Sequence, residues 1–253
     1  MAANLIVIKI GSSSLTNSEG LLDAKNIKRL ARQISKLVLS RRQVVLVSSG
    51  AIVSGSGRLG YKEKPRSIFE KQAAAAVGQS LLMRQWEKAF ERFHLPVGQI
   101  LLTADVFKNP VMRQNAYNTI HTLLKHSAVP VVNENDTVSV DEIKVGDNDN
   151  LSAMVSVLMK ADLLINLTDV DGFYVKTKEG ATLKLDEVEE ITEKIERHAN
   201  LSEKKSGTGG MITKLEAAKL AKQAGIPMVI AHGKTADIFK IAVGEKIGTR
   251  FIV

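Results

Sequence analysis

The sequence contains no cysteine among its 253 residues, few aromatic side chains and no long apolar run. Without cysteine, the chain cannot form disulfides, thiolate zinc sites or a cysteine nucleophile. Aromatic residues make up only 4% of the chain, which leaves few platforms on which nucleic-acid bases could stack. No apolar stretch approaches the roughly 20 residues that a membrane-spanning helix needs. We therefore expect no membrane association and no nucleic-acid partner.

The remaining composition is that of a folded protein with an excess of positive charge. Hydrophobic residues make up 44% of the chain, enough for a full core, and the net charge is +8. Basic residues recur at helical spacing between Lys25 and Lys36, which is typical of a solvated helix face; attraction to an anionic substrate is the second interpretation. Residues 1–10 lack a basic leader, so we expect no signal peptide and a cytoplasmic protein. Triplets such as Asn166-Leu167-Thr168 are then chance matches to a glycosylation motif.

Short β-branched runs alternate with longer helical patterns along the whole chain. Apolar strands that alternate with helices indicate an α/β fold, with a mostly parallel sheet covered on both faces in three layers. A more charged segment, 172–207, is interpreted as a hairpin and short helix inserted before the last βαβ unit. No linker is apparent, so we expect a single domain over 1–253. The strands are expected at Leu5–Ile10, Val44–Val47, Val97–Leu102, Val129–Val132, Leu163–Leu167, Met228–Ile230 and Arg250–Val253, and the helices at about 23–40, 67–93, 112–126, 150–160, 210–224 and 235–242.

Polar clusters follow several of these strands. The densest are Asn133–Asp136, directly after a strand, and Gly146–Ser152, at the start of a helix. Polar side chains packed this closely are costly to bury without a partner, and a small zwitterion would supply one. Carboxylates can accept from its ammonium group, while amides and helix N-termini can donate to its carboxylate. The alternative is a pair of turns with Asp and Asn caps.

Two glycine-rich loops each have a lysine nearby. Gly11-Ser12-Ser13 follows Lys9, and Gly207–Gly210 precedes Lys214. Such loops let backbone N–H groups approach phosphate oxygens, and two ammonium groups beside a transferring phosphoryl group suit phosphoryl transfer. Lys9 also interrupts a strand that should be buried, so its ammonium needs a nearby anion. A structural ion pair for Lys9 and a surface position for Lys214 are the alternatives.

Several standard templates do not fit. The sequence has no Gly-x-x-x-x-Gly-Lys-Ser/Thr motif, which excludes a P-loop enzyme. Residues 55–60 match the dinucleotide fingerprint, but they lie too far beyond the preceding strand and no acid follows about 20 residues later. The 146–150 cluster lacks the glycine and distal glutamate of a calcium loop, and the five histidines show no metal-ligand spacing. We assign no protein metal ligand.

These motifs, in this order, resemble the amino acid kinase family, and specifically its glutamate-phosphorylating branch. The resemblance covers essentially the whole chain and rests on Lys9-Ile-Gly-Ser, Ser48-Ser-Gly-Ala-Ile, Ala76-Val-Gly-Gln-Ser, Gly98-Gln-Ile-Leu-Leu-Thr, Asn133-Glu-Asn-Asp, Ile143-Lys-Val-Gly-Asp-Asn-Asp-Asn-Leu-Ser-Ala and Gly207-Thr-Gly-Gly-Met-Ile-Thr-Lys. It implies the amino acid kinase fold and transfer of the ATP γ-phosphoryl group to the side-chain carboxylate of L-glutamate. The product would be γ-glutamyl phosphate, the first intermediate of proline synthesis.

The resemblance also implies roles for individual residues. Lys9 and Lys214 would stabilise the transferring phosphoryl group, and Asp149 would hold both lysines in register. Glutamate binding is implied for Ser49, Gly50, Asn133, Asp136, Asp147 and Asn148. Nucleotide binding is implied for Lys9, Gly11, Thr168, Asp169, Thr208, Gly209, Gly210, Met211, Ile212, Thr213 and Lys214. The attacking carboxylate is already ionised at neutral pH, so no general base is required, and Mg²⁺ is expected to ride on the ATP phosphates.

The resemblance leaves regulation and assembly as expectations. It implies feedback inhibition by proline, which could compete near Asn133–Asn148, and a homo-oligomer. Apolar residues on 67–93, including Leu81, Leu82, Trp86 and Phe90, fit core packing, with a dimer face as the alternative. Many family members carry a further C-terminal domain that we do not expect here. The alternatives for function are an amino-acid sensor or RNA-binding protein without activity, or a sibling kinase with another acceptor.

Overall fold

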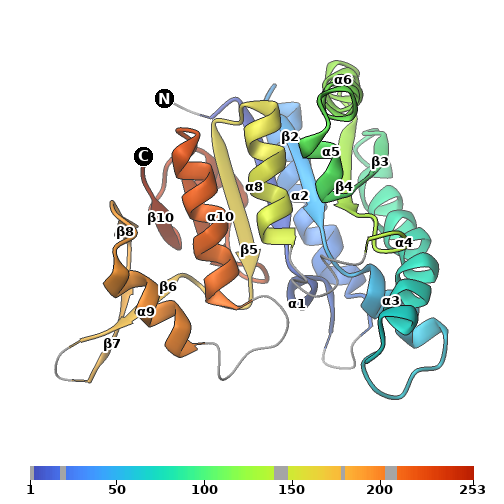
Figure 1. The fold of residues 1–253 in the computed structure, drawn as a ribbon. Coiled ribbons are helices and arrows are strands. Elements are labelled where there is room, and N and C mark those ends of the chain that lie inside the picture. The colour runs from blue at the N-terminus through green and yellow to red at the C-terminus, as the bar shows by residue number, and fades with distance from the viewer. Residues whose placement is uncertain (1–2, 18–20, 140–147, 178–179, 203–209) are drawn as a thin grey trace.

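The computed structural model describes residues 3–17, 21–139, 148–177, 180–202 and 210–253, and it places one large twisted sheet between two layers of helices (Figure 1). In chain order the elements are β1 (Leu5–Ile10), α1 (Ser12–Leu15), α2 (Ala24–Leu39), β2 (Gln43–Ser48), α3 (Ala51–Arg58), α4 (Ile68–Glu91), β3 (Val97–Leu102), α5 (Ala104–Lys108), α6 (Pro110–Lys125), β4 (Val129–Glu134), α8 (Asn148–Met159), β5 (Leu163–Thr168), β6 (Phe173–Lys176), β7 (Thr182–Leu185), β8 (Glu187–Val188), α9 (Glu193–Ser202), α10 (Met211–Gln223), β9 (Met228–His232), α11 (Ile238–Ala242) and β10 (Thr249–Phe251).

Within the described residues, the main sheet has eight strands in the order β3-β4-β2-β1-β5-β9-β10-β8. Its pairings are parallel except for that of β10 with β9, so the prediction of a mostly parallel sheet is confirmed. The carboxyl ends of the parallel strands therefore share one edge, and α1 and α3, which follow β1 and β2, lie along it at the lower side of Figure 1. In sheets of this kind, ligands bind at that edge.

The two faces of the sheet carry separate hydrophobic cores. One core combines Leu5 and Val7 of β1 with residues of α6, α8 and α10, and the other combines Ile6, Ile8 and Ile10 with residues of α2, α4 and α11. Because side chains alternate between faces along a strand, Lys9 must point to the same face as Leu5 and Val7. The period of two thus directs Lys9 toward α8 and α10.

Local sequence signals explain where the principal helices begin. Helix α4 starts at a capping box, in which Ser67 and Glu70 bond each other's backbone N–H groups. The Glu70 carboxylate accepts from the backbone N–H groups of both Ser67 and Arg66. These hydrogen bonds lower the pKa of the Glu70 carboxyl. Asp23 caps α2, and Asn109 followed by Pro110 starts α6. These helices end within two residues of the predicted boundaries.

Helix α3 lies in a stretch where the sequence did not predict a helix. It contains Gly55 and Gly57, which weaken a helix, and it packs against α4. Residues 55–60, which match the dinucleotide fingerprint, fall within and just after this helix. The shorter helices α1 and α5 were also not predicted, and α11 begins at Ile238, three residues later than expected. The last strand, β10, ends at Phe251 and so is shorter than predicted.

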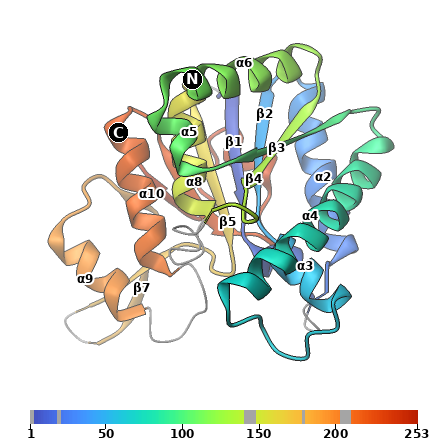
Figure 2. The ribbon, with the colours of Figure 1, turned by 45° about the vertical axis from the view of Figure 1, so that its right-hand side comes forward.

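The segment 172–207 forms the expected hairpin and helix as far as it is described. Strands β6 and β7 pair antiparallel, and α9 follows them. Figure 2 shows α9 and β7 beside the lower end of α10. Strand β8, which was not predicted, pairs with β10 and so joins the main sheet.

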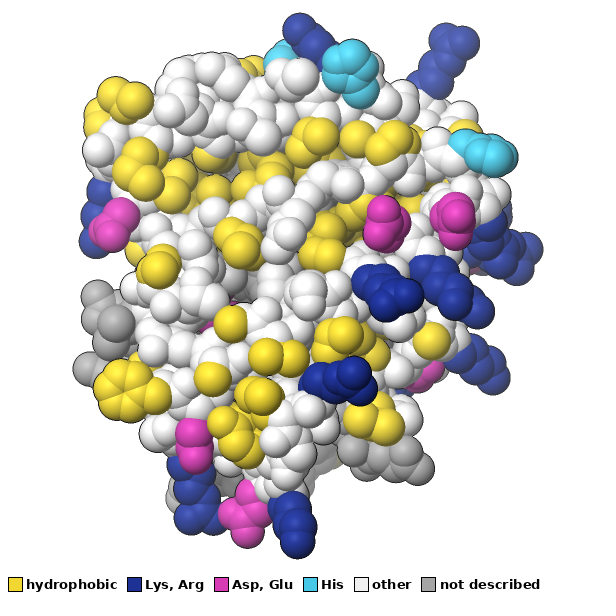
Figure 3. All heavy atoms as spheres, turned by 90° about the vertical axis from the view of Figure 1, so that its right-hand side faces the viewer, with side chains coloured by type: hydrophobic (Ala, Val, Ile, Leu, Met, Phe, Trp, Pro, Cys, Tyr) yellow, Lys and Arg dark blue, Asp and Glu magenta, His cyan; other side chains and the backbone are white. Residues whose placement is uncertain are grey.

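Helix α4 is mostly a core element. Leu82, Trp86 and Phe90 are fully buried, which confirms core packing for those positions, whereas Leu81 is half-buried. Exposed apolar side chains include Phe69 of α4, Leu101 of β3 and Val111 of α6. Figure 3 shows apolar groups scattered over the face that it presents. Among the described residues, none of the helices is long and apolar enough to cross a membrane.

Candidate active site

The predicted catalytic residues converge on one buried carboxylate. Asp149, the second residue of α8, is fully buried; Lys9 Nζ lies 2.5 Å from its Oδ1, and Lys214 Nζ lies 3.1 Å from its Oδ2. Lys9 and Lys214 are also almost completely buried, with 4% and 5% of their surfaces exposed. The surface alternative for Lys214 is therefore wrong. The carboxylate compensates one of the two positive charges, so the cluster retains a net positive charge suited to an anionic ligand.

The position of this cluster follows from the fold. Lys9 reaches the α8 and α10 face through the alternation of β1. Asp149 and Lys214 lie in the first turns of α8 and α10, near the positive ends of the two helix dipoles. A carboxylate is favoured there, and so is an anionic ligand. Lys9 does form the ion pair that was the alternative to a functional role. Its partner, Asp149, lies at the ligand-binding edge of the sheet, so the pair is part of the candidate site.

A chain of amides lies beside this cluster. The Nδ2 of Asn148 lies 2.8 Å from Ser49 Oγ and 2.9 Å from Asn133 Oδ1, and donates to both. Asn133 in turn donates through its Nδ2 to Oε1 of Gln79, at 2.8 Å. The structure therefore brings Ser49 together with Asn133 and Asn148, which are distant from it in sequence, as a polar group at the ends of β2 and β4.

Other predicted acceptor-binding residues lie close to the amide chain or outside the described residues. Gly50 is buried directly before α3, with φ of 106°, a left-handed conformation that favours glycine. Asp136 is half-buried just beyond β4. Asp147 lies outside the described residues.

The described members of the predicted nucleotide-binding set lie at the ends of β1 and β5 and at the start of α10. The N–H of Gly11 donates to the carbonyl of Leu167 at the end of β5, at 2.9 Å, which joins the first glycine loop to Thr168 and Asp169. The hydroxyl of Thr168 donates to the carboxylate of Asp169 at 2.9 Å. Gly210 caps α10 and is followed by Met211, Ile212, Thr213 and Lys214 in its first turn. Thr208 and Gly209 lie outside the described residues.

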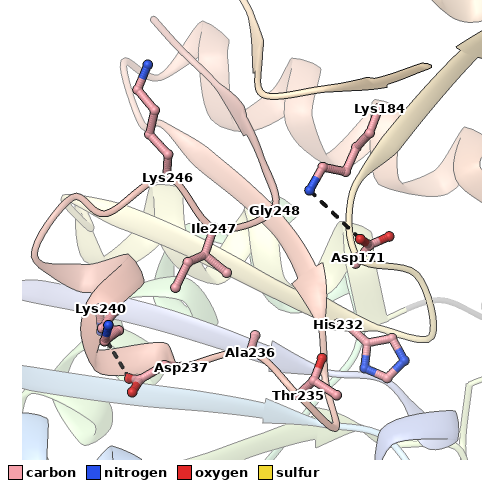
Figure 4. A pocket seen from close by; sticks show the side chains of 10 residues that line it. All are labelled: Asp171, Lys184, His232, Thr235, Ala236, Asp237, Lys240, Lys246, Ile247 and Gly248. Atoms are coloured by element: carbon pink, nitrogen blue, oxygen red, sulfur yellow. Dashed lines mark hydrogen bonds and ion pairs between the residues drawn. The ribbon is translucent and has the colours of Figure 1, made fainter.

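A hollow of about 460 Å³ opens next to this region, beyond the end of β9 (Figure 4). Its lining includes Asp171, Lys184, His232 and Thr235. Tyr174 donates from its hydroxyl to Asp171, and this hydrogen bond lowers the pKa of Asp171 and raises that of Tyr174. His232 is the neighbour of Thr168 across β5 and β9, so the hollow lies beside the strand end that carries Thr168.

Three polar contacts at the site were not predicted from the sequence. Asn166 donates to Asp149, Gln79 accepts from Asn133, and the Trp86 indole donates to Ser48 Oγ at 3.0 Å. The signal for Asn166 was the same as for Lys9, a polar residue in an otherwise apolar strand. Gln79 belongs to the quoted Ala76–Ser80 motif and Trp86 was expected in the core, but neither was expected to bond at the site, because both lie on a helix whose packing partners only the fold defines.

Comparisons with known proteins bear on the family and the fold. The model of the amino acid kinase family matches residues 4–232. A glutamate 5-kinase of Clostridium perfringens is 48% identical over 255 residues, covering 98% of this chain and 94% of that protein. A glutamate 5-kinase of a Thermoanaerobacter species is 46% identical over 252 residues, covering 98% of this chain but 67% of that longer protein. Among solved structures, carbamate kinase from Giardia lamblia bound to AMP-PNP shares the fold, with a TM-score of 0.67, 20% identity, and 99% of each chain covered.

Proposed function

Since the chain belongs to the glutamate 5-kinase branch of the amino acid kinase family, we propose that it transfers the γ-phosphoryl group of ATP to the side-chain carboxylate of L-glutamate. The observation that carries this proposal is the buried arrangement of Lys9, Asp149 and Lys214. Two ammonium groups held by one carboxylate at the ligand-binding edge can stabilise a phosphoryl group between two anionic substrates.

In the proposed reaction, one carboxylate oxygen of glutamate attacks the γ-phosphorus and the bond to the β,γ-bridging oxygen breaks, which gives γ-glutamyl phosphate and ADP. The attacking oxygen needs no proton removed, because the carboxyl is ionised at neutral pH. The barrier lies in bringing two anions together in line. Lys9 and Lys214 would lower it by neutralising charge on the transferring group, and Asp149 would keep both side chains aligned for that purpose.

Binding of glutamate is proposed at the amide chain beside the lysines. The amides of Asn133 and Asn148 and the Ser49 hydroxyl offer neutral donors and acceptors. Asp136 supplies a carboxylate for the substrate ammonium group, with Asp147 as a further lining residue. A substrate without a charged amine, such as an acetylated amino acid, would leave Asp136 without this ionic contact, so the pocket favours free glutamate.

Binding of ATP is proposed at the first glycine loop, at Thr168 and Asp169, and at the start of α10 from Thr208 to Lys214. The described residues contain no group of three or more His, Asp or Glu side chains that could hold a metal ion. Both oxygens of Asp149 already accept from protein donors. We therefore propose that Mg²⁺ is carried by the ATP phosphates, where it would neutralise part of their charge.

We also propose a cytoplasmic location, assembly as a homo-oligomer and feedback inhibition by proline. Proline resembles a cyclised glutamate, so it could compete for the residues near Asn133–Asn148. Competition predicts that proline raises the apparent KM for glutamate while leaving kcat unchanged.

The proposed function is tested by ATP-dependent formation of γ-glutamyl hydroxamate with L-glutamate, Mg²⁺ and hydroxylamine. Hydroxylamine traps the unstable acyl phosphate, so product reports both the acceptor and the bond formed. Aspartate, N-acetylglutamate and UMP serve as competing acceptors. Product with glutamate alone supports the proposal. Activity with another acceptor would retain the kinase assignment and overturn the glutamate pocket, and a folded, ATP-binding protein without activity would overturn both.

A further inference from the structure

Asn166 is a polar side chain at a buried strand position that apolar residues usually occupy. It lies within β5, is fully buried, and is surrounded in sequence by Leu163, Leu164, Ile165 and Leu167. On this strand Leu164 belongs to the core under α8 and α10, and alternation puts Asn166 on the same face. Burial of an amide costs free energy unless hydrogen bonds replace those lost to water, so a specific contact is expected here.

That contact is to the carboxylate of Asp149. Asn166 Nδ2 lies 2.7 Å from Asp149 Oδ1, which also faces Lys9. The other oxygen, Oδ2, accepts from Lys214 at 3.1 Å and from the Thr213 hydroxyl at 3.0 Å. Each carboxylate oxygen is therefore held by one ammonium and one neutral donor. The four donors come from β1, β5 and α10.

The neutral donors constrain the carboxylate in a way that the lysines alone cannot. A lysine is a flexible chain with a rotating ammonium group, whereas Asn166 projects from a central strand and is rigidly placed. Lys9 and Asn166 are direct neighbours across β1 and β5, so the strand register fixes their spacing. The two neutral donors, Asn166 and Thr213, fix the rotation of the Asp149 carboxylate group. The orientation of the carboxylate in turn fixes the positions of both ammonium groups.

The amide carbonyl of Asn166 shows that the hydrogen bond to Asp149 is accompanied by a loss of folding stability. Its Oδ1 is buried and has no hydrogen-bond partner among the described residues. Turning the amide over would point that oxygen at the negatively charged Asp149, so the observed orientation is the favourable one. A buried acceptor without a partner reduces stability. An apolar side chain of similar shape would avoid this penalty, and it would lose only the donor to Asp149.

We propose that Asn166 is a positioning residue for phosphoryl transfer: its amide N–H fixes the orientation of the Asp149 carboxylate and thereby aligns Lys9 and Lys214. This role rests on the proposed function of the site. Asn166 acts through Asp149 and holds neither substrate. Alignment of the lysines matters most when charge builds on the transferring group, so the effect falls on kcat and spares substrate binding.

The test compares Asn166→Leu with Leu164→Val, a change of the same strand face two residues earlier. Thermal unfolding and the kinetic constants for ATP and glutamate are measured for both variants and for the wild type. For Asn166→Leu we expect kcat to fall roughly tenfold, an effect of the size seen when a group that orients a metal ligand is removed. KM for either substrate should change less than about twofold, and Tm should be equal or higher. Leu164→Val should show the opposite pattern, with a lower Tm and an unchanged kcat.

Wild-type kcat in a folded Asn166→Leu protein would overturn the proposal, and so would a loss of kcat that occurs only together with a lower Tm. If Asn166→Leu does not fold, Asn166→Val takes its place with the same expectations, since valine is smaller and suits a strand. The wild-type protein separates this proposal from the proposed function. If it phosphorylates an acceptor other than glutamate, the acceptor assignment fails, and the Asn166 comparison is made with that acceptor.

Discussion

Gly55 of α3 and Gly78 of α4 face each other where the two helices cross, with no room for a side chain at either position. A Cβ added at Gly78 would lie 1.8 Å from the carbonyl oxygen of Ala51 and 2.5 Å from the Gly55 nitrogen. A Cβ at Gly55 would lie 1.8 Å from the carbonyl oxygen of Ala74. These close contacts lock the start of α3 against α4. Gly50 lies directly before the start of α3 and next to Ser49, so the contact between the glycines supports the proposed acceptor pocket.

We therefore expect Gly78→Ala to affect stability and glutamate binding together. The methyl group must displace the backbone at Ala51, which costs about 1–3 kcal/mol for overpacking, partly offset by the better helix propensity of alanine. Movement of Ala51 carries Ser49 and Gly50 with it, so KM for glutamate should rise more than KM for ATP. Urea unfolding and initial rates measure the two effects. Ser80→Ala, on the exposed side of α4, is the control and should leave both unchanged.

Asp149→Ala should lower turnover far more than substrate binding. The variant leaves the ammonium groups of Lys9 and Lys214 without the carboxylate between them, so their alignment is lost when it is most needed. Loss of one group that stabilises charge in a transition state typically costs about 2.7–4 kcal/mol, or roughly a hundred- to a thousandfold in kcat. Steady-state kinetics with both substrates measure the fall in kcat and any change in KM.

Asp162→Ala is the matched control for Asp149→Ala. Asp162 accepts from the backbone N–H groups of Asn4 and Leu5, both at 2.8 Å, at the opposite end of β1. Its loss should lower Tm without lowering kcat. If Asp149→Ala raised KM for glutamate and left kcat intact, Asp149 would belong to substrate binding instead.

Asp136→Asn should weaken glutamate binding, because it replaces a charged partner of the substrate ammonium group by a neutral one. The expected loss is about 1–2 kcal/mol, seen as a roughly tenfold higher KM for glutamate with KM for ATP unchanged. Asp186→Asn, which changes an exposed carboxylate between β7 and β8, is the control. An unchanged KM for glutamate in Asp136→Asn would remove Asp136 from the pocket.

Tyr174→Phe should change how stability depends on pH at both extremes. The hydrogen bond to Asp171 lowers the pKa of that carboxyl below its usual 3.8 and raises the pKa of Tyr174 above its usual 10.0. The hydrogen bond therefore stabilises the fold at pH values between the usual pKa of the aspartate and that of the tyrosine. It is lost as pH falls through the depressed pKa of Asp171, and as pH rises through the raised pKa of Tyr174.

The difference in urea midpoint between wild type and Tyr174→Phe should consequently be constant near neutrality. It should shrink toward zero as pH falls through the lowered pKa of Asp171 and as pH rises through the raised pKa of Tyr174. The effect is expected to be small because both side chains are exposed. A difference that persisted at the acid extreme would mean that the Tyr174 hydroxyl stabilises the fold through something other than its hydrogen bond to the ionised Asp171 carboxylate.

Local periodicity and hydrophobic pattern accounted for much of the fold. The strands of the parallel core and the long helices were predicted to within a few residues, because apolar runs, caps and the 3.6-residue period are properties of neighbouring residues. The strand-end clusters also predicted that the candidate site lies at one edge of the sheet. Lys9 stood out in the sequence because a charge inside a buried strand requires a partner.

The identity of that partner, and the supports around it, depended on the tertiary structure. Asp149 lies 140 positions from Lys9 in the sequence and reaches it only because α8 packs on the face toward which β1 directs the lysine. Helix α3 forms despite its glycines because α4 packs closely against it, an effect that no local propensity contains. In the sequence, Asn166 was notable only as part of a chance match to a glycosylation motif. The register of β1 and β5 places it beside Lys9. Sequence patterns report which side chains must be buried or paired; only the packed chain decides with which partner, since those contacts join residues that are distant along the sequence.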